Sequence, residues 1–155
     1  MSGEQTVPFQ TTLYVRDTCL CMHVQRAARA LARHFDDALR PVGLTNGQFS
    51  LLMSLNRPEP PPIGPVAALL AMDRTTLTAA LKPLERRGLV RIKPHPGDRR
   101  SRILVLTAKG RRQLARALPA WTAAHRAIEA LIPNGDPEAL RVNLRALSSG
   151  SGPPV

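Results

Sequence analysis

The chain has 155 residues, of which 43% are hydrophobic and 3% aromatic, so we expect one domain with a core of aliphatic side chains. A net charge of +11 and a pI of about 11.4 are typical of domains that bind a polyanion. Cys19 and Cys21 are too few for a disulfide framework. Neither a signal-peptide pattern nor a long apolar run is present, so we expect a cytoplasmic protein with no membrane partner.

The folded domain is expected over residues 18–147. A flexible N-terminal segment at 1–17 and a disordered, Pro-containing tail at 148–155 flank it. Within the domain, apolar residues recur at spacings of three and four over residues 18–40, and this spacing predicts a long first helix.

Capping residues mark the helices that follow. Thr45 begins the second helix, and Gln48 three residues later completes a capping box. A proline-rich connector covers residues 57–62, and Ile63 behind it is a candidate for a short edge strand before a short helix. The next helix is expected over 73–87, with Asp73 as its N-cap. Its core-facing residues, spaced as i, i+4 and i+7, are Leu77, Leu81 and Leu84.

A β-hairpin is predicted after that helix, because residues 89–93 and 102–106 have strand character on either side of a turn-rich tip. Thr107 caps a helix through about Ala130, and Asp136 caps a last helix. A short helix, a turn, a longer helix and a hairpin in this order predict a winged helix-turn-helix over residues 45–107. The fold class is therefore mainly α with a small β-wing.

The positive charge is concentrated in the middle of the chain. Residues 73–112 hold 12 of the 22 Lys and Arg residues and only three of the 11 Asp and Glu residues. An Arg-rich composition inherited from a GC-rich genome is the alternative explanation, but such a bias would spread the charge evenly. The distribution favours a nucleic-acid-binding surface formed by the helix at 73–87 and the hairpin.

The exposed face of the helix at 73–87 combines hydroxyl groups with cations. Hydroxyls reach base edges and phosphates in the major groove, and threonine methyls can contact thymine methyls. The alternative is an ordinary exposed helix face, although three threonines in four positions suit a helix surface poorly. The candidate DNA contacts on this helix are Arg74, Thr75, Thr76, Thr78, Lys82 and Arg86.

The hairpin tip supplies a second group of candidates. Arg99, Arg100 and Arg102 crowd the turn, and arginine enters narrow minor grooves of negative potential. Asp98 would repel DNA if it were free, so we expect it to fix one of these arginines by a bidentate ion pair. A solvated charged loop is the alternative for this segment.

Residues 44–110 closely resemble the MarR family of bacterial regulators, through LTNGQFSLLMSL and MDRTTLTAALKPLERRGLVRIKPHPGDRRSRILVLTAKG. The resemblance implies that Asp98 and Arg100 form the wing's minor-groove device. It also implies a homodimeric repressor of a pseudo-palindromic operator, joined by helices at 18–40 and 108–147. The proline-rich connector and Pro83 depart from the family pattern.

Dimerisation is also plausible from the residues alone. The terminal helices carry apolar stripes, yet they bracket the domain and have little core of their own to cover. A two-fold dimer would bury these stripes and place two recognition helices about one DNA turn apart. Packing of the terminal helices as an intramolecular hairpin is the alternative.

The sensing mechanism has several candidate residues. Cys21 resembles in placement the reactive cysteine of the OhrR peroxide-sensing branch, and Cys19 is a second candidate thiol near cationic side chains. Buried structural cysteines are the alternative, and a metal site with His23 is a third, although a helix points these three side chains in different directions. No metal or other cofactor is expected.

The MarR resemblance further implies a small aromatic effector bound between the dimer helices and the DNA-binding part. The candidate lining residues are His23, Arg26, Met53 and Trp121. Two other classes of function remain open, a basic RNA-binding winged-helix protein and a thiol or metal enzyme. We expect no enzyme, because the sequence offers no base-oriented nucleophile and no phosphate-binding glycine loop.

Overall fold

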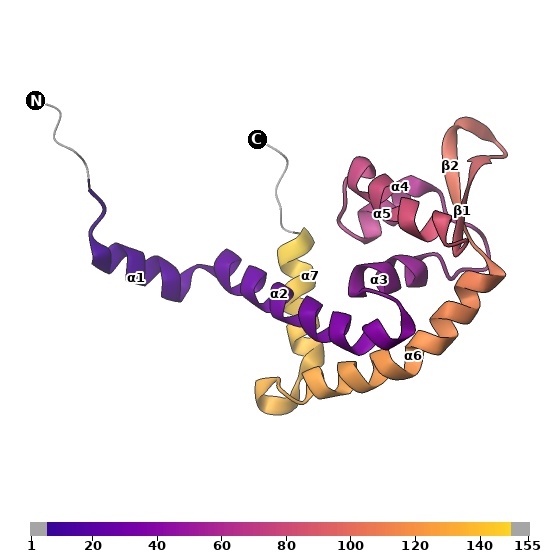
Figure 1. Ribbon diagram of the computed structural model, residues 1–155. Coiled ribbons are helices and arrows are strands. Elements are labelled where there is room, and N and C mark those ends of the chain that lie inside the picture. Colours follow the sequence, from indigo (N-terminus) through magenta and orange to yellow (C-terminus); the bar gives the residue numbers. More distant parts are fainter. Residues whose placement is uncertain (1–5, 150–155) are drawn as a thin grey trace, which may run out of the picture.

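The computed structural model describes residues 6–149, which are mostly helical with one two-stranded antiparallel sheet (Figure 1). The elements in chain order are α1 (Phe9–Thr18), α2 (Leu20–Leu39), the 3₁₀ helix η1 (Arg40–Val42), α3 (Asn46–Ser54), α4 (Ile63–Leu69), α5 (Arg74–Arg86), β1 (Val90–His95), β2 (Asp98–Leu106), α6 (Ala108–Glu129), η2 (Pro133–Gly135) and α7 (Pro137–Ser149). This arrangement confirms the predicted fold class.

Figure 1 shows a head formed by α3, α4, α5 and the sheet, with α6 leading away from it. The second half of α2 packs along α6, and α1 projects away from the rest of the chain. The head therefore carries the helix-turn-helix and the wing, while the terminal helices lie outside it.

The core of the head is built from aliphatic side chains, as the low aromatic content predicted. Leu77, Leu81 and Leu84 are fully buried on one side of α5, which confirms their predicted orientation. They pack against buried residues of every other element of the head, among them Leu52, Leu55, Val66, Leu89, Val90, Leu104 and Leu106. Burial of each such side chain contributes roughly 1.5–3 kcal/mol, so the position of α5 is firmly set.

The N-caps predicted at Thr45, Asp73, Thr107 and Asp136 are present, whereas neither Asp17 nor Thr18 caps α2, whose N-cap is Cys19. The Thr45 hydroxyl accepts from the Gln48 amide at 3.2 Å in a complete capping box. The Asp73 carboxylate accepts from the Thr76 amide at 2.8 Å. Thr107 and Asp136 accept in the same way at the starts of α6 and α7.

The hairpin is longer than the sequence predicted. Its register pairs Val90 with Leu106 and Lys93 with Ile103, and a bulge at Pro94 and His95 precedes the turn. Ile63 does not form an edge strand, because it begins α4. The preceding Pro62 makes a single bridge to Ile103 instead.

The N-terminal region also differs from the prediction of a flexible segment at 1–17. Residues 9–18 form α1, and the chain then breaks at Cys19, where ψ is 105°, so the long helix begins at Leu20 rather than at residue 18. None of the residues of α1 is buried, so no core-facing spacing marked this helix in the sequence. At the other end, α7 includes Ser148 and Ser149 of the predicted tail, and 150–155 lie outside the described residues.

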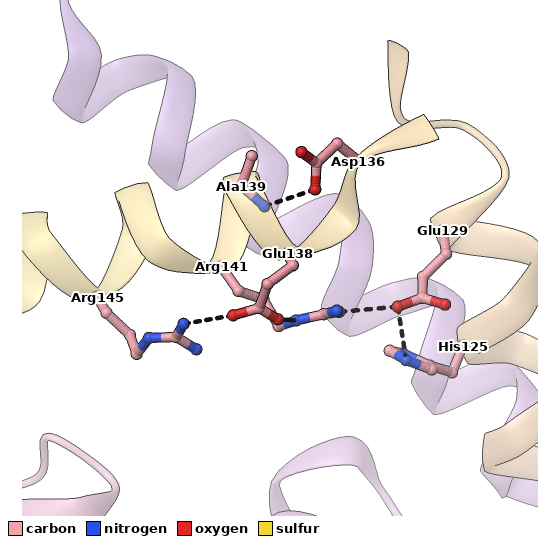
Figure 2. A network of polar contacts seen from close by, with 7 residues as sticks. All are labelled: His125, Glu129, Asp136, Glu138, Ala139, Arg141 and Arg145. Atoms are coloured by element: carbon pink, nitrogen blue, oxygen red, sulfur yellow. Dashed lines mark hydrogen bonds and ion pairs between the residues drawn. The ribbon is translucent and has the colours of Figure 1, made fainter. Parts of the chain in front are cut away.

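One ion pair joins α7 to α6, within the network of polar contacts that Figure 2 shows. Arg141 on α7 donates to Glu129 on α6 and to Glu138 on its own helix, each at 2.8 Å. Arg145 adds a second bond to Glu138 at 2.6 Å, and His125 lies 3.1 Å from Glu129. The hydrogen bonds from the Arg141 guanidinium are the main reason that the pKa values of Glu129 and Glu138 lie below the ordinary value for a glutamate.

Candidate nucleic-acid interface

Helix α5 divides into a buried side and an exposed side. All six predicted DNA contacts of this helix are exposed, and the residues at four-residue spacing are Arg74, Thr78, Lys82 and Arg86. Pro83 is accommodated inside the helix without ending it. The fold therefore presents the predicted polar face to solvent as one continuous surface.

A surface hollow of about 310 Å³ lies on this face, lined by Arg74, Thr75, Thr78, Ala79 and Lys82. Thr76 does not line the hollow, and its hydroxyl donates to the Asp73 carboxylate at 2.7 Å. The backbone and side-chain hydrogen bonds from Thr76 lower the pKa of Asp73, so the carboxylate stays charged at the positive end of the helix. Thr76 thus supports the start of α5 rather than its outer surface.

The wing places all three predicted arginines in solvent. The Arg102 guanidinium donates to the carbonyl of Arg99 at 3.1 Å and is held against the turn. In the described part of the chain, the guanidinium groups of Arg99 and Arg100 have no hydrogen bond or ion pair. These two side chains are therefore available for an external anion.

The predicted ion pair between Asp98 and a wing arginine is wrong for the free chain. The Asp98 carboxylate instead accepts from the backbone N–H of Arg100 at 2.9 Å. A bond to a backbone group two residues away fixes no long side chain, so it costs less entropy than an arginine ion pair. Asp98 shapes the wing turn and leaves the Arg100 guanidinium unbound.

A family model for MarR matches residues 44–101. The crystal structure of the transcriptional regulator MosR of M. tuberculosis in complex with DNA is 37% identical, with a TM-score of 0.77, and covers 84% of this chain and 94% of that one. The transcriptional repressor CouR bound to a 23-mer DNA duplex is 31% identical, with a TM-score of 0.77, and covers 94% of this chain and 99% of that one.

The chain belongs to the MarR family. Its similarity to a further MarR-type protein, the transcriptional repressor MprA of Escherichia coli K12, is 32% identity over 120 residues. That match covers 76% of this chain but 65% of MprA, so the chain spans less than two thirds of this curated relative's length. These relatives support the DNA-binding interpretation over the RNA-binding alternative.

Hydrogen bonds join the residues at the C-terminal end of α5 to the first turn of α6. The Thr107 hydroxyl donates to the Gly88 carbonyl, and the Lys109 ammonium donates to the Arg87 carbonyl, each at 2.7 Å. Gly110 lies directly against Leu89, where a Cβ atom would come within 2.3 Å of the carbonyl oxygen. Lys109 and Gly110 belong to the LTAKG segment of the family resemblance, but spacing alone gave them no role.

The candidate sensor cysteines lie at the start of α2. Cys21 is exposed, and its Sγ accepts a hydrogen bond from the Gln25 amide at 3.2 Å. It lines an apolar groove of about 380 Å³ between α2 and α7, together with Leu20, Val24, Leu144 and Leu147. His23 bonds the Cys19 carbonyl, and within residues 6–149 no three His, Cys, Asp or Glu side chains are grouped to hold a metal.

The four candidate effector-binding residues lie in three separate places. His23 and Arg26 are exposed on the first half of α2, and Met53 lines a different groove between α3 and α6. Trp121 stacks on Phe49 and His125, with ring centroids 5.7 Å and 4.6 Å apart. Trp121 thus packs the junction of α3 and α6, and these four side chains do not form one pocket in this single chain.

None of the helices within residues 6–149 combines the length and apolar character that a bilayer crossing needs.

Proposed function

We propose that this MarR-family chain is a homodimeric transcriptional repressor that binds a pseudo-palindromic DNA operator in the cytoplasm. The exposed polar face of α5, together with the unbound guanidinium groups of Arg99 and Arg100 on the wing, is the observation that carries the proposal. An α-helix fits the major groove, and arginines of a wing enter the minor groove. MosR and CouR have both been solved with DNA, which supports binding rather than catalysis as the activity.

The dimer is supported by apolar side chains that the single chain leaves exposed on its terminal helices. On α2 and α7 these are Leu20, Val24, Leu31, Leu140, Leu144 and Leu147. An exposed surface of this kind marks a protein interface. We propose that the helices at 18–40 and 108–147 form the two-fold interface, which sets two copies of α5 at the spacing of successive major grooves.

The DNA proposal is tested by fluorescence anisotropy with a labelled duplex that the full chain enriches from a random-sequence pool. We expect the affinity to fall steeply between about 50 and 200 mM salt, because phosphate contacts release counterions. Unlabelled duplex should displace the probe, and a structured RNA hairpin should not. Equal displacement by the RNA would instead support the RNA-binding alternative.

Release by a small aromatic ligand is the first candidate for regulation. CouR has also been solved with p-coumaroyl-CoA, at 29% identity to this chain and a TM-score of 0.76. Because His23, Arg26, Met53 and Trp121 do not converge in one chain, a pocket that includes several of them needs the second protomer. A panel of aromatic acids and their CoA thioesters, added to the preformed DNA complex, tests this route by loss of anisotropy.

Thiol oxidation is the second candidate, supported by the exposed Cys21 thiol at the N-terminal end of α2. A peroxide would oxidise this thiol to a sulfenic acid and place a polar group in the apolar groove against α7. Hydrogen peroxide should then release DNA, and a thiol reductant should restore binding. Peroxide-dependent release that persists in Cys21→Ser would rule out this residue as the sensor.

A further inference from the structure

The three threonines of α5 differ in what their hydroxyl groups do. The Thr76 hydroxyl donates to the Asp73 carboxylate, and the Thr78 hydroxyl donates to the Arg74 carbonyl at 2.7 Å within the helix. Across residues 6–149, the Thr75 hydroxyl has no hydrogen-bond partner. Only one of the three hydroxyl protons is therefore free for a partner outside the helix.

Thr78 is nevertheless exposed, and it lines the hollow on the outer face of α5. Because its hydroxyl proton is directed to the helix backbone, this side chain has no donor left for a base edge, and its methyl group is the apolar part that it offers to the hollow. Ala79 is also exposed in the same hollow and adds a second methyl. The hollow thus has an apolar floor, with the Thr75 hydroxyl at its edge.

The two cations of the hollow stand on either side of this floor. Arg74 and Lys82 lie four residues before and four residues after Thr78, and both are exposed. Cations at this separation along a helix suit phosphates of the DNA backbone, which carry no sequence information. The apolar floor between them is left to contact the base edges in the groove.

We infer that this floor binds the 5-methyl group of a thymine in each operator half-site, with Thr78 as the residue that selects it. Thymine is the one DNA base whose major-groove edge carries a methyl group. A methyl that enters the hollow loses contact with water against Thr78 and Ala79, while cytosine offers no such group. The inference rests on the proposed DNA-binding function and names the base that α5 selects.

The test uses the duplex enriched from a random-sequence pool by the wild-type chain, synthesised once with dT and once with dU at the thymine positions. The only chemical difference between the two duplexes is the 5-methyl group. We expect wild-type binding to weaken about fourfold for each half-site that loses its methyl, the usual effect of exposing one methyl-sized group. Anisotropy titrations measure the ratio of the two dissociation constants.

Matched variants assign the effect to one side chain. Thr78→Ser removes only the methyl and should reduce the preference for dT over dU, whereas Thr78→Val keeps a methyl and should maintain that preference. Thr12→Ser makes the same deletion on α1, away from the head, and should leave the wild-type ratio. Thermal unfolding followed by circular dichroism checks that each variant is folded.

The outcomes separate this inference from the proposed function. If the wild-type chain enriches no duplex, DNA binding itself fails. If it binds a specific duplex with equal affinity for dT and dU, the thymine assignment is wrong. If Thr78→Ser binds more weakly but retains the wild-type ratio, Thr78 only supports the helix, because a structural role would weaken both duplexes equally.

Discussion

Arg100 extends from the wing with its guanidinium group unpaired within the described residues, next to an Arg102 that is bound to the turn. We expect Arg100→Ala to weaken operator binding about tenfold or more and to lower the slope of log affinity against log salt by about two, because the proposed dimer loses one such contact in each half-site. Anisotropy titrations at several salt concentrations measure both quantities.

Arg16→Ala is the matched control for this variant, because Arg16 is an exposed arginine of α1, and Figure 1 shows that α1 projects away from the wing. It removes the same charge from the chain, so a general electrostatic effect would weaken both variants equally. Unchanged affinity in Arg100→Ala would contradict the role of the wing.

Among the described glycines, Gly110 is the one at which an added Cβ atom would lie closest to its neighbours. A Cβ atom there would lie 2.3 Å from the Leu89 carbonyl oxygen and 2.6 Å from Cδ1 of Leu106. We expect Gly110→Ala to lower the free energy of unfolding by about 1–3 kcal/mol, because the backbone junction between β1 and α6 must open. Urea unfolding followed by circular dichroism gives the value.

Gly47→Ala provides the comparison, since nothing lies within 4 Å of a Cβ atom at this position in α3. There the substitution should be neutral or should stabilise by about 0.5–1 kcal/mol, because alanine favours a helix over glycine. Equal effects at the two positions would show that the close contact at Gly110 is relieved without cost.

At the scale of elements, the ion pair between Arg141 and Glu129 joins helix α7 to α6. Glu129 and Glu138 have a lowered pKa in the folded chain, so their stabilising effect is complete above the ordinary value of 4.5 and is lost as the pH falls through the lowered values. Arg141→Gln removes the principal partner of both. We expect a weaker dependence of the urea midpoint on pH between about 6 and 3 in this variant than in the wild type.

An identical pH dependence in the two proteins would show that other carboxylates govern acid unfolding. Asp73, which also has a lowered pKa, is unchanged in Arg141→Gln, so part of the acid sensitivity should remain in the variant. Asp73→Asn tests that remaining part separately.

Elements with a buried side and a capping residue were predictable from the sequence. Leu77, Leu81 and Leu84 marked the buried side of α5 by spacing, and Asp73 marked its start. Helix α1 was not predictable, because spacing rules detect a face turned toward a core and α1 buries none of its residues. Within the interface, residue types indicated the exposed arginines and threonines correctly.

Which partner each polar group takes was not predictable from residue type. Several guanidinium groups and backbone N–H groups lie close to Asp98 in the sequence. In the structure, the Asp98 carboxylate accepts a hydrogen bond from the backbone N–H of Arg100. The Thr78 hydroxyl likewise had two possible partners, a helix carbonyl and solvent, and in the structure it donates to the Arg74 carbonyl. Such choices depend on side-chain rotamers, which the spacing of residues does not determine.

At the scale of the whole molecule, the unpaired apolar surface of α2 and α7 should determine the oligomeric state. Leu144 of α7 is exposed and lines the same apolar groove as Cys21. Leu144→Asp places a charge in the proposed interface, and we expect light scattering to find monomers that remain helical and bind DNA more weakly. Leu69→Asp makes the same change at an exposed leucine of α4, and this variant should stay dimeric.

The junction formed by Thr107, Lys109 and Gly110 has a mechanical consequence. Because the C-terminal end of α5 is fastened to the first turn of α6, the recognition helix cannot move without α6. Helix α6 has 22 residues and is therefore about 33 Å long. A tilt of about 5° introduced at its far end displaces the junction by about 3 Å. In the proposed dimer, the long helix would therefore amplify a slight rotation at its far end into a shift that misaligns two copies of α5 with successive major grooves.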